Sequence, residues 1–406
     1  MGTNFSYKMG ISTEEHDAFV KASSETNLLQ SSAWAQVKSN WASERIGIYK
    51  GNEQVASMSI LIKPLPLKQS IIYIPRGPVL DYSDKELLGY TFGILKKIGK
   101  EKKAIFVKFD PAILYKQYSI NEVGTESEKA KEIIYNIISA GAKWTGLTME
   151  IADSIQPRFQ ANRYLHDNLE TSFPKHTKRL MKDAIRRGVK VKRSDISEID
   201  VFANVVALTE ERKKIALRNK AYFKKLMTIY GDDAYLHLAT VNIAEHLVTF
   251  KSELARVEKD LSETLEHQVK RIKKLSDQKE SLKKYISEFE RYSVKYPDEV
   301  VIAGILSIGY GTSMEMLYAG MNEDFKKFYP QYLLYPKVFQ DAFDNGIAWA
   351  NMGGVEGSLD DGLTKFKANF NPTIEEFIGE FNIPVNPLYY PANALYKLRK
   401  TLRNKH

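Results

Sequence analysis

Apolar and polar residues alternate in short blocks along the first 160 residues, and each block has the length of one helix or strand. Strand-like blocks rich in β-branched and aromatic residues occur at Arg45–Tyr49, Val55–Ile62 and Ala104–Pro111. Apolar residues recur with helical spacing at Asp84–Ile98 and Glu128–Ala140. Short strands that alternate with helices in this way predict an α/β (α+β) fold.

Three further segments extend the pattern. "SSAWAQVKSNW" (Ser31–Trp41) is typical of a capped amphipathic helix. "SIIYIPRGPVLDY" predicts a buried strand that is interrupted by Pro75 and Pro78, and Trp144–Ile151 predicts a final strand. The 406 residues suffice for two or three domains, so we expect a first domain over residues 1–160.

The segment 232–296 contains neither glycine nor proline, and its apolar residues lie three and four positions apart. One apolar series covers 247–261 and a second covers 272–289, with a break near Glu263–Gln268. This pattern predicts two antiparallel helices packed as a coiled-coil arm. One long straight helix is the alternative.

The strand patterns "EVVIAGILSIGYG" and "SMEMLYAGM" follow this helical segment. A basic segment, Lys175–Arg193, precedes it and predicts a helix whose nine lysines and arginines are opposed only by Asp183. That helix is either a solvated face or a surface that contacts phosphates. We therefore expect the arm to be an insertion, with the following boundaries: arm 242–296, second domain 161–241 and 297–406.

Composition narrows the classes of function. The chain has no cysteine, which excludes disulfides, thiolate zinc sites and a cysteine nucleophile and fits a reducing cytoplasm. The seven histidines lack metal-ligand spacing, and no run of about 18 apolar residues occurs, so we expect neither a metal site nor a transmembrane segment. A net charge of +9 suits anionic partners such as RNA or an acidic lipid surface, although an ordinary basic enzyme is equally compatible.

The segment Gly353–Thr373 places a glycine-rich, acidic turn before Lys365, Phe366 and Lys367. Its glycine spacing does not match a nucleophile elbow, a P-loop or a dinucleotide-binding loop. If "TKFKANF" is a strand, both lysines point to one side and Phe366 to the other. A fixed lysine could then stabilise an oxyanion during acyl transfer, whereas the alternative is a solvated strand edge protected by lysines.

Six segments, taken in order along the chain, form one series: "SSAWAQVKSNW", "YIPRGPVLDY", "FVKFDP", "LRNKAYF", "LYAGM" and "NMGGVEGSLDDGLTKFKANFNPTIEEFIGEF". Together they resemble the FemABX family, most closely its MurM-like branch, over nearly the whole chain. The resemblance implies two GNAT-like acyltransferase domains with an inserted helical arm. It also implies transfer of serine or alanine from aminoacyl-tRNA to the stem-peptide lysine of lipid II, without a cofactor, at the cytoplasmic face of the membrane.

The resemblance carries roles to individual positions. Lys367 corresponds to the cation that stabilises the oxyanion, and Phe223 departs from the family pattern because related enzymes often have a second tyrosine there. Asp110, before a proline, is either the base that accepts the amine's proton or a turn cap, and the substrate's ribose hydroxyl is another proton relay. The expected substrate contacts are Lys38, Arg218, Tyr222, Tyr318 and Phe366.

Four cations cluster where the second arm helix is expected to begin: Lys270, Arg271, Lys273 and Lys274. Cations at a helix N-terminus oppose the helix dipole, so helix stability does not explain them. We expect this tip to contact tRNA phosphates, with a solvated tip or a protein-docking arm as the alternatives.

Two other classes of function stay open at this point. An acyl-CoA-dependent N-acyltransferase would share the expected fold, but the sequence has no convincing glycine-rich pyrophosphate loop. A non-catalytic RNA- or membrane-binding protein would explain the basic charge and the arm. The choice among serine, alanine and glycine depends on pocket shape rather than on a motif.

Overall fold

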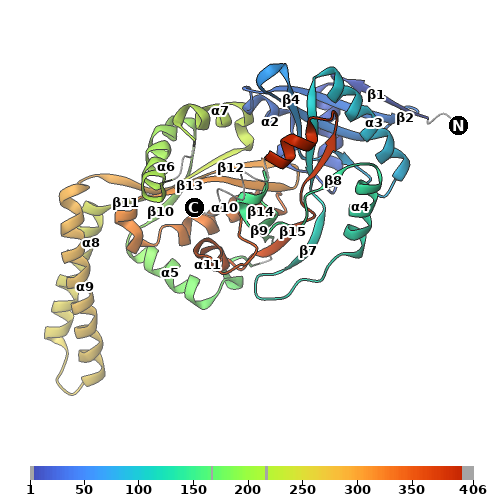
Figure 1. The fold of residues 1–406 in the computed structure, drawn as a ribbon. Helices are drawn as coiled ribbons and strands as arrows, with labels where there is room; N and C mark the ends of the chain where they lie inside the picture. Colours follow the sequence, from blue (N-terminus) through green and yellow to red (C-terminus); the bar gives the residue numbers. More distant parts are fainter. Residues whose placement is uncertain (1–3, 166–167, 215–217, 396–406) are drawn as a thin grey trace.

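The computed structural model describes residues 4–165, 168–214 and 218–395, and it contains two sheets of eight strands each (Figure 1). The prediction of an α/β fold is confirmed. The first sheet has the strand order β1-β2-β3-β4-β6-β16-β8, with β5 paired to β3. Its strands are β1 Phe5–Met9, β2 Ala42–Lys50, β3 Glu53–Pro64, β4 Ser70–Arg76, β5 Val79–Leu80, β6 Ala104–Pro111, β8 Lys143–Trp144 and β16 Phe381–Pro384.

The helices of this half of the molecule are α1 Thr13–Ala22, α2 Ser32–Val37, α3 Lys85–Glu101 and α4 Glu128–Ser139. Helix α3 begins where Asp84 caps it, because its carboxylate accepts the backbone N–H groups of Glu86 at 3.0 Å and Leu87 at 2.9 Å. The apolar face of α3 packs on the sheet, where the Phe92 ring meets Phe109 of β6 at 5.4 Å.

The second sheet has the order β10-β11-β12-β13-β14-β9-β15-β7. Its strands are β7 Leu114–Ser119, β9 Phe159–Tyr164, β10 Lys190–Ser194, β11 Ala234–Asn242, β12 Glu299–Tyr310, β13 Ser313–Met321, β14 Trp349–Gly354 and β15 Thr373–Phe377. Its helices are α5 Lys175–Arg186, α6 Ile199–Lys213, α7 Lys220–Tyr230, α10 Gln331–Asp344 and α11 Gly362–Ala368.

Helices cover both faces of this second sheet. Alternate residues of β11 pack on opposite sides, because side chains alternate along a strand. Leu236 and Leu238 belong to the core beneath α6 and α7, whereas Tyr235 and Ala239 belong to the core beneath α10. The face beneath α6 and α7 carries part of the candidate site.

The predicted strand over Trp144–Ile151 is wrong beyond its first residue, because β8 ends at Trp144. The C-terminal strand β16 pairs with β8 only through Phe381–Trp144 and Asn382–Lys143. Gly146 then adopts a positive φ of 91°, which turns the chain away from the sheet.

The predicted basic helix is also shorter than expected, since α5 ends at Arg186, Arg187 caps it, and the remaining three cations lie on β10. Gly188 has a φ of 78°, and a Cβ there would lie 2.0 Å from the His246 ring. This left-handed glycine ends the helix, as glycine often does at this position. The positive charges therefore divide between a helix and a strand.

Two helices, α8 Ile243–Glu263 and α9 Val269–Lys295, form the arm that projects from the body (Figure 1). The break between them lies where the apolar pattern predicts it, so the alternative of one straight helix is wrong. Phe250 and Phe289 pack edge to face at 5.0 Å, and Val257, Leu275 and Leu282 are buried with them. The arm is therefore held together by an apolar seam.

The two sheets do not divide at one position of the chain. Strand β7, from the N-terminal part, lies in the second sheet, and β16, from the C-terminal end, lies between β6 and β8 in the first. Phe381 of β16 stacks on Phe109 at 5.3 Å and on Trp144 at 6.4 Å. The exchange couples the two halves, and the domain boundaries given above stay a prediction.

We expect Phe381→Ala to lower the free energy of unfolding by about 3–5 kcal/mol, because it removes a fully buried ring and leaves a cavity. The control Leu388→Ala, whose side chain is half exposed, should change it by less than about 0.5 kcal/mol. Urea unfolding followed by fluorescence measures both. Equal effects of the two substitutions would contradict the coupling role of β16.

Candidate active site

Asp110, at the end of β6, is buried where the two sheets meet. Its Oδ2 accepts a hydrogen bond from the Tyr73 hydroxyl at 3.0 Å, and its Oδ1 accepts one from the backbone N–H of Arg76 at 2.8 Å. Burial raises the pKa of Asp110 to about 7, opposed by the positive Arg76 and reinforced by Glu380. The carboxyl holds strand β4 rather than its own turn, and its pKa suits proton exchange near neutral pH.

Arg76 is a buried residue to which the sequence pattern assigned no role, although it lies inside "YIPRGPVLDY". Its backbone adopts a φ of 51°, which is uncommon for a non-glycine residue. The guanidinium donates to the Pro157 carbonyl at 2.7 Å and lies over the Phe377 ring at 4.2 Å. Burial raises the pKa values of Asp110, Glu315 and Glu375, and the positive charge of Arg76 opposes that rise at all three carboxyl groups.

The segment "TKFKANF" is helical, and the expectation of a strand is wrong. Asp361 caps α11 by accepting the backbone N–H groups of Leu363 at 2.7 Å and Thr364 at 3.1 Å. Residues two apart on a helix point about 200° apart. Lys365 is therefore exposed, while Lys367 is only 3% exposed.

Lys367 is held against the glycine-rich turn, where its Nζ donates to the Gly354 carbonyl at 2.8 Å. Gly353 has a φ of 87°, and a Cβ at Gly354 would lie 2.5 Å from Pro157. Glycine is required at both positions, at the first by conformation and at the second by space. The turn thus positions a buried cation rather than forming a nucleotide cradle.

A polar network extends from this turn into β13. The Asn351 side-chain oxygen accepts the Gly353 N–H at 2.7 Å, and its nitrogen donates to Glu315 at 2.8 Å and to Gln160 at 3.0 Å. The parallel pairing of β13 with β14 stops at Glu315 and Asn351, although both strands continue. Burial raises the pKa of Glu315 to about 7. A glutamate inside the apolar strand "SMEMLYAGM" is the sequence signal that could have indicated this network.

Four of the predicted substrate contacts form a second cluster. The Arg218 guanidinium lies 5.1 Å from the Tyr222 ring centre, and the Tyr222 and Tyr318 rings are 5.9 Å apart. Burial, and then the neighbouring Arg218, lower the pKa of Lys38. Two cations kept this close favour an anionic group between them.

A β-bulge relates this second cluster to the acidic network. Tyr318 pairs with Leu306 and Glu315 with Ile308, because the register between β12 and β13 shifts by one residue. Cross-strand partners share a face of the sheet, so Glu315 and Tyr318 point to the same side. The bulge thereby aims both clusters at the face beneath α6 and α7.

Phe366 and Phe223, the two phenylalanines that the sequence analysis singled out, both pack against other aromatic rings. Phe366 is half-buried against Phe370 at 5.5 Å and Tyr335 at 5.3 Å, so its role in substrate binding stays a prediction. Phe223 is fully buried and meets Tyr318 at 5.1 Å and Phe202 at 5.1 Å. The position that lacks the family's second tyrosine is therefore part of the core.

The arm-tip cations lie apart from both clusters. Lys270, Arg271, Lys273 and Lys274 are exposed in the first turns of α9, at the far end of the arm (Figure 1). Their contact with tRNA stays a prediction. Within the described ranges, no helix is long and apolar enough to cross a bilayer, and no group of three or more histidine, aspartate or glutamate side chains could hold a metal ion.

The FemAB family matches residues 11–397 of the chain. The chain belongs to the FemAB family. It is 28% identical over 410 residues to the lipid II:glycine glycyltransferase of Staphylococcus aureus (strain MRSA252), which covers 94% of both chains. The enzyme of the same name from Staphylococcus epidermidis (strain ATCC 35984) is 28% identical over 403 residues, again with 94% of each chain covered.

A crystal structure of FemX has the same fold as this FemAB chain, with a TM-score of 0.77 and 26% identity. The similarity covers 95% of this chain and 99% of the FemX chain. The predicted family is therefore confirmed for nearly the whole length. The closer likeness to the MurM-like branch stays a prediction.

The raised pKa of Asp110 makes a prediction about stability. In the folded protein this pKa is about 7, whereas in an unfolded chain an aspartate titrates near 3.9. As the pH rises from about 4 to 7, ionisation favours the unfolded state, so the wild type loses stability that Asp110→Asn does not lose. Urea unfolding should show that the free energy of unfolding of the variant rises relative to that of the wild type from about pH 4 to 7. Above about pH 7 the difference should stay constant. A difference that is constant with pH would contradict the burial of an ionisable carboxyl.

Proposed function

We propose that this FemAB protein transfers an aminoacyl group, serine or alanine, from aminoacyl-tRNA to the stem-peptide lysine amine of lipid II. The observation that carries the proposal is the position of buried Lys367 on the turn at Gly354, which lies against Pro157. The Pro157 carbonyl binds Arg76, and the backbone of Arg76 binds the buried carboxyl of Asp110. The names of the S. aureus and S. epidermidis relatives support lipid II as the acceptor. We assign the two sheets to two GNAT-like units.

The proposed chemistry uses the energy already stored in the aminoacyl ester. The neutral lysine amine attacks the ester carbonyl, a C–N bond forms, and a tetrahedral oxyanion develops that Lys367 stabilises. The ester C–O bond then breaks, and the ribose oxygen of the tRNA leaves with a proton. Asp110 accepts the proton that the amine loses, and the neighbouring ribose hydroxyl is the alternative relay. This acyl transfer requires no cofactor.

The remaining residues are assigned to substrate binding. Lys38 and Arg218 suit a phosphate or carboxylate of the lipid precursor, and the ring of Tyr222 supports the guanidinium. Because lipid II is anchored in the bilayer, we place the enzyme at the inner face of the cell membrane. The cations of α5 then meet anionic head groups, each contributing about 1 kcal/mol at low salt.

Glycine is the second candidate for the transferred residue, because the relatives from S. aureus and S. epidermidis are named glycyltransferases. Side chains of serine, alanine and glycine differ by a methyl or hydroxyl group, a difference that pocket shape discriminates by about 1–3 kcal/mol.

Incubation of the protein with lipid II and either seryl-, alanyl- or glycyl-tRNA tests this proposal, with mass spectrometry of the product. We expect a mass increase of one serine or alanine residue that disappears after ribonuclease treatment of the tRNA. Glycine addition would overturn the choice of residue only. Transfer from an acyl-CoA with no transfer from any tRNA, or no transfer at all, would overturn the proposed function.

We expect Lys367→Ala to lower kcat by about 10²–10³-fold, the usual cost of removing one oxyanion partner. The matched control is Lys365→Ala on the same short helix, whose exposed side chain should leave kcat within about twofold. Circular dichroism checks that both variants fold. Near-normal turnover by folded Lys367→Ala would remove Lys367 from the mechanism.

A further inference from the structure

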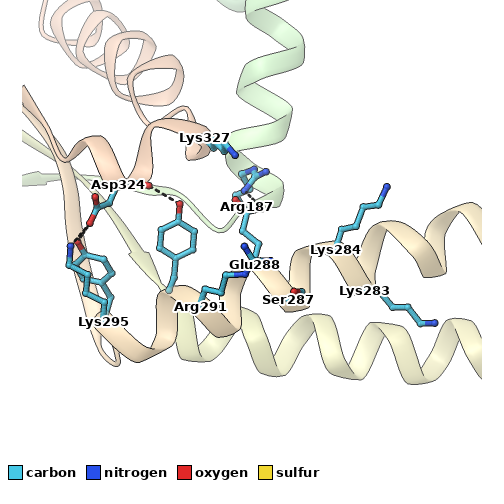
Figure 2. Close-up of a pocket in the computed structure, with 11 residues that line it drawn as sticks. Arg187, Lys283, Lys284, Ser287, Glu288, Arg291, Lys295, Asp324 and Lys327 are labelled. Atoms are coloured by element: carbon cyan, nitrogen blue, oxygen red, sulfur yellow. Dashed lines mark hydrogen bonds and ion pairs between the residues drawn. The ribbon is translucent and has the colours of Figure 1, made fainter.

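A groove lies at the inner corner where the arm joins the body (Figure 2). Its volume is about 750 Å³, and its walls come from α9, from Arg187 at the end of α5 and from the 3-10 helix η7 Glu323–Phe328. Six cationic side chains line it against two acidic ones, Glu288 and Asp324. The cations are Arg187, Lys283, Lys284, Arg291, Lys295 and Lys327.

Both acidic side chains are already engaged in joining the arm to the body. Glu288 pairs with Arg187 at 3.0 Å, and Asp324 pairs with Lys295 at 2.5 Å and accepts the Tyr296 hydroxyl at 2.6 Å. Figure 2 shows Asp324 and Lys295 at one end of the lining residues and Arg187 with Glu288 nearer the middle. These pairs account for two of the six cations and join the arm to the body.

The other cations are not needed for that attachment. Lys284, Arg291 and Lys327 are exposed, and among the described residues no carboxylate lies within ion-pair distance of them. Lys284 and Arg291 are seven residues apart, which places them on one face of α9, and Lys327 lies on the opposite wall. Like charges that line a concave surface concentrate positive potential there.

The spacing of these charges indicates the shape of the ligand. The α9 cations outside these pairs, Lys284 and Arg291, are about 10 Å apart along the helix, at 1.5 Å per residue, instead of converging on one point. A nucleic-acid strand carries one phosphate about every 3.4 Å of helix axis, so several phosphates match this length. A single head group would need convergent donors, and a flat membrane surface does not enter an inner corner.

We propose that this groove, at the root of the arm, binds the phosphate backbone of RNA. The proposal rests on the proposed function, in which the RNA is the tRNA of the aminoacyl donor. Contacts from lysine and arginine to phosphates carry no sequence information, so they would accept tRNAs that differ in sequence. The root of the arm is nearer than the tip to the two sheets, which carry the proposed active site (Figure 1). A tRNA bound at the root would therefore lie closer to that active site than a tRNA bound only at the tip cluster.

Uncharged tRNA is the probe, and fluorescence anisotropy across a salt series is the measurement. The groove variant combines Lys284→Gln, Arg291→Gln and Lys327→Gln and leaves both pairs at the arm root intact. The matched control removes three exposed lysines around α3, at the opposite end of the molecule, through Lys85→Gln, Lys100→Gln and Lys102→Gln. We expect the groove variant to bind tRNA about tenfold more weakly, with the slope of log affinity against log salt reduced by about two to three.

The control should keep the slope within about one unit of the wild type. In transfer assays, the groove variant should show a higher KM for aminoacyl-tRNA and an unchanged KM for lipid II. If the wild type transfers from aminoacyl-tRNA but the groove and control variants bind tRNA with equal affinity and equal salt slope, the proposed RNA site in the groove is overturned. The proposed function would then still stand. Loss of binding to phosphatidylglycerol vesicles with full tRNA binding would also overturn it, in favour of a lipid site. A wild type that uses no tRNA overturns both proposals.

Discussion

The burial of ionisable groups between the two sheets is the constraint on which the rest of the structure depends. A carboxyl that leaves water requires hydrogen bonds, and Asp110 obtains them from Tyr73 and from the backbone of Arg76. The second bond holds Arg76 in a left-handed conformation that a non-glycine residue seldom adopts. The arginine in turn provides positive charge near Glu315 and Glu375 in the second sheet. The two sheets therefore share one electrostatic centre.

Lys367 is held near Pro157, which Arg76 also contacts, by the turn at Gly353 and Gly354. The chain must pass Gly353 and Gly354 closely enough for the lysine to bond a backbone carbonyl, and side chains at these glycines would be strained or would collide with Pro157. Asn351 then joins the turn to Glu315. The proposed catalytic cation is thus fixed by main-chain geometry and a buried amide, which is the preorganisation that oxyanion stabilisation requires.

In the arm, different residues serve packing and the proposed ligand binding. Its apolar seam, with Phe250, Leu282 and Phe289, holds α8 and α9 together, while Glu288 and Asp324 fasten its root to the body. The cations outside these pairs contribute little to stability, because exposed ion pairs and solvated charges are worth at most about 1 kcal/mol. Their position in a concave corner is better explained by a ligand than by the fold.

The sequence by itself determined most of the local elements and the family. Strands such as Ala104–Pro111 and the two arm helices follow from patterns in neighbouring residues, because apolar periodicity, caps and turns act over a few positions. The role proposed for Lys367 came from the likeness to a known family. The likeness of six segments to a known family was sufficient to identify the FemAB membership.

Tertiary structure decided the rest. Only the folded chain shows that "TKFKANF" lies in a helix capped by Asp361 and that β8 pairs with β16 through two residues and stops at Trp144. Only the folded chain shows that α5 stops before Gly188, where a side chain would collide with His246. The roles of Arg76, Glu315 and Asn351 were also missed. Their hydrogen bonds and charges act between strands that lie far apart in the chain, and no pattern within one segment encodes such contacts.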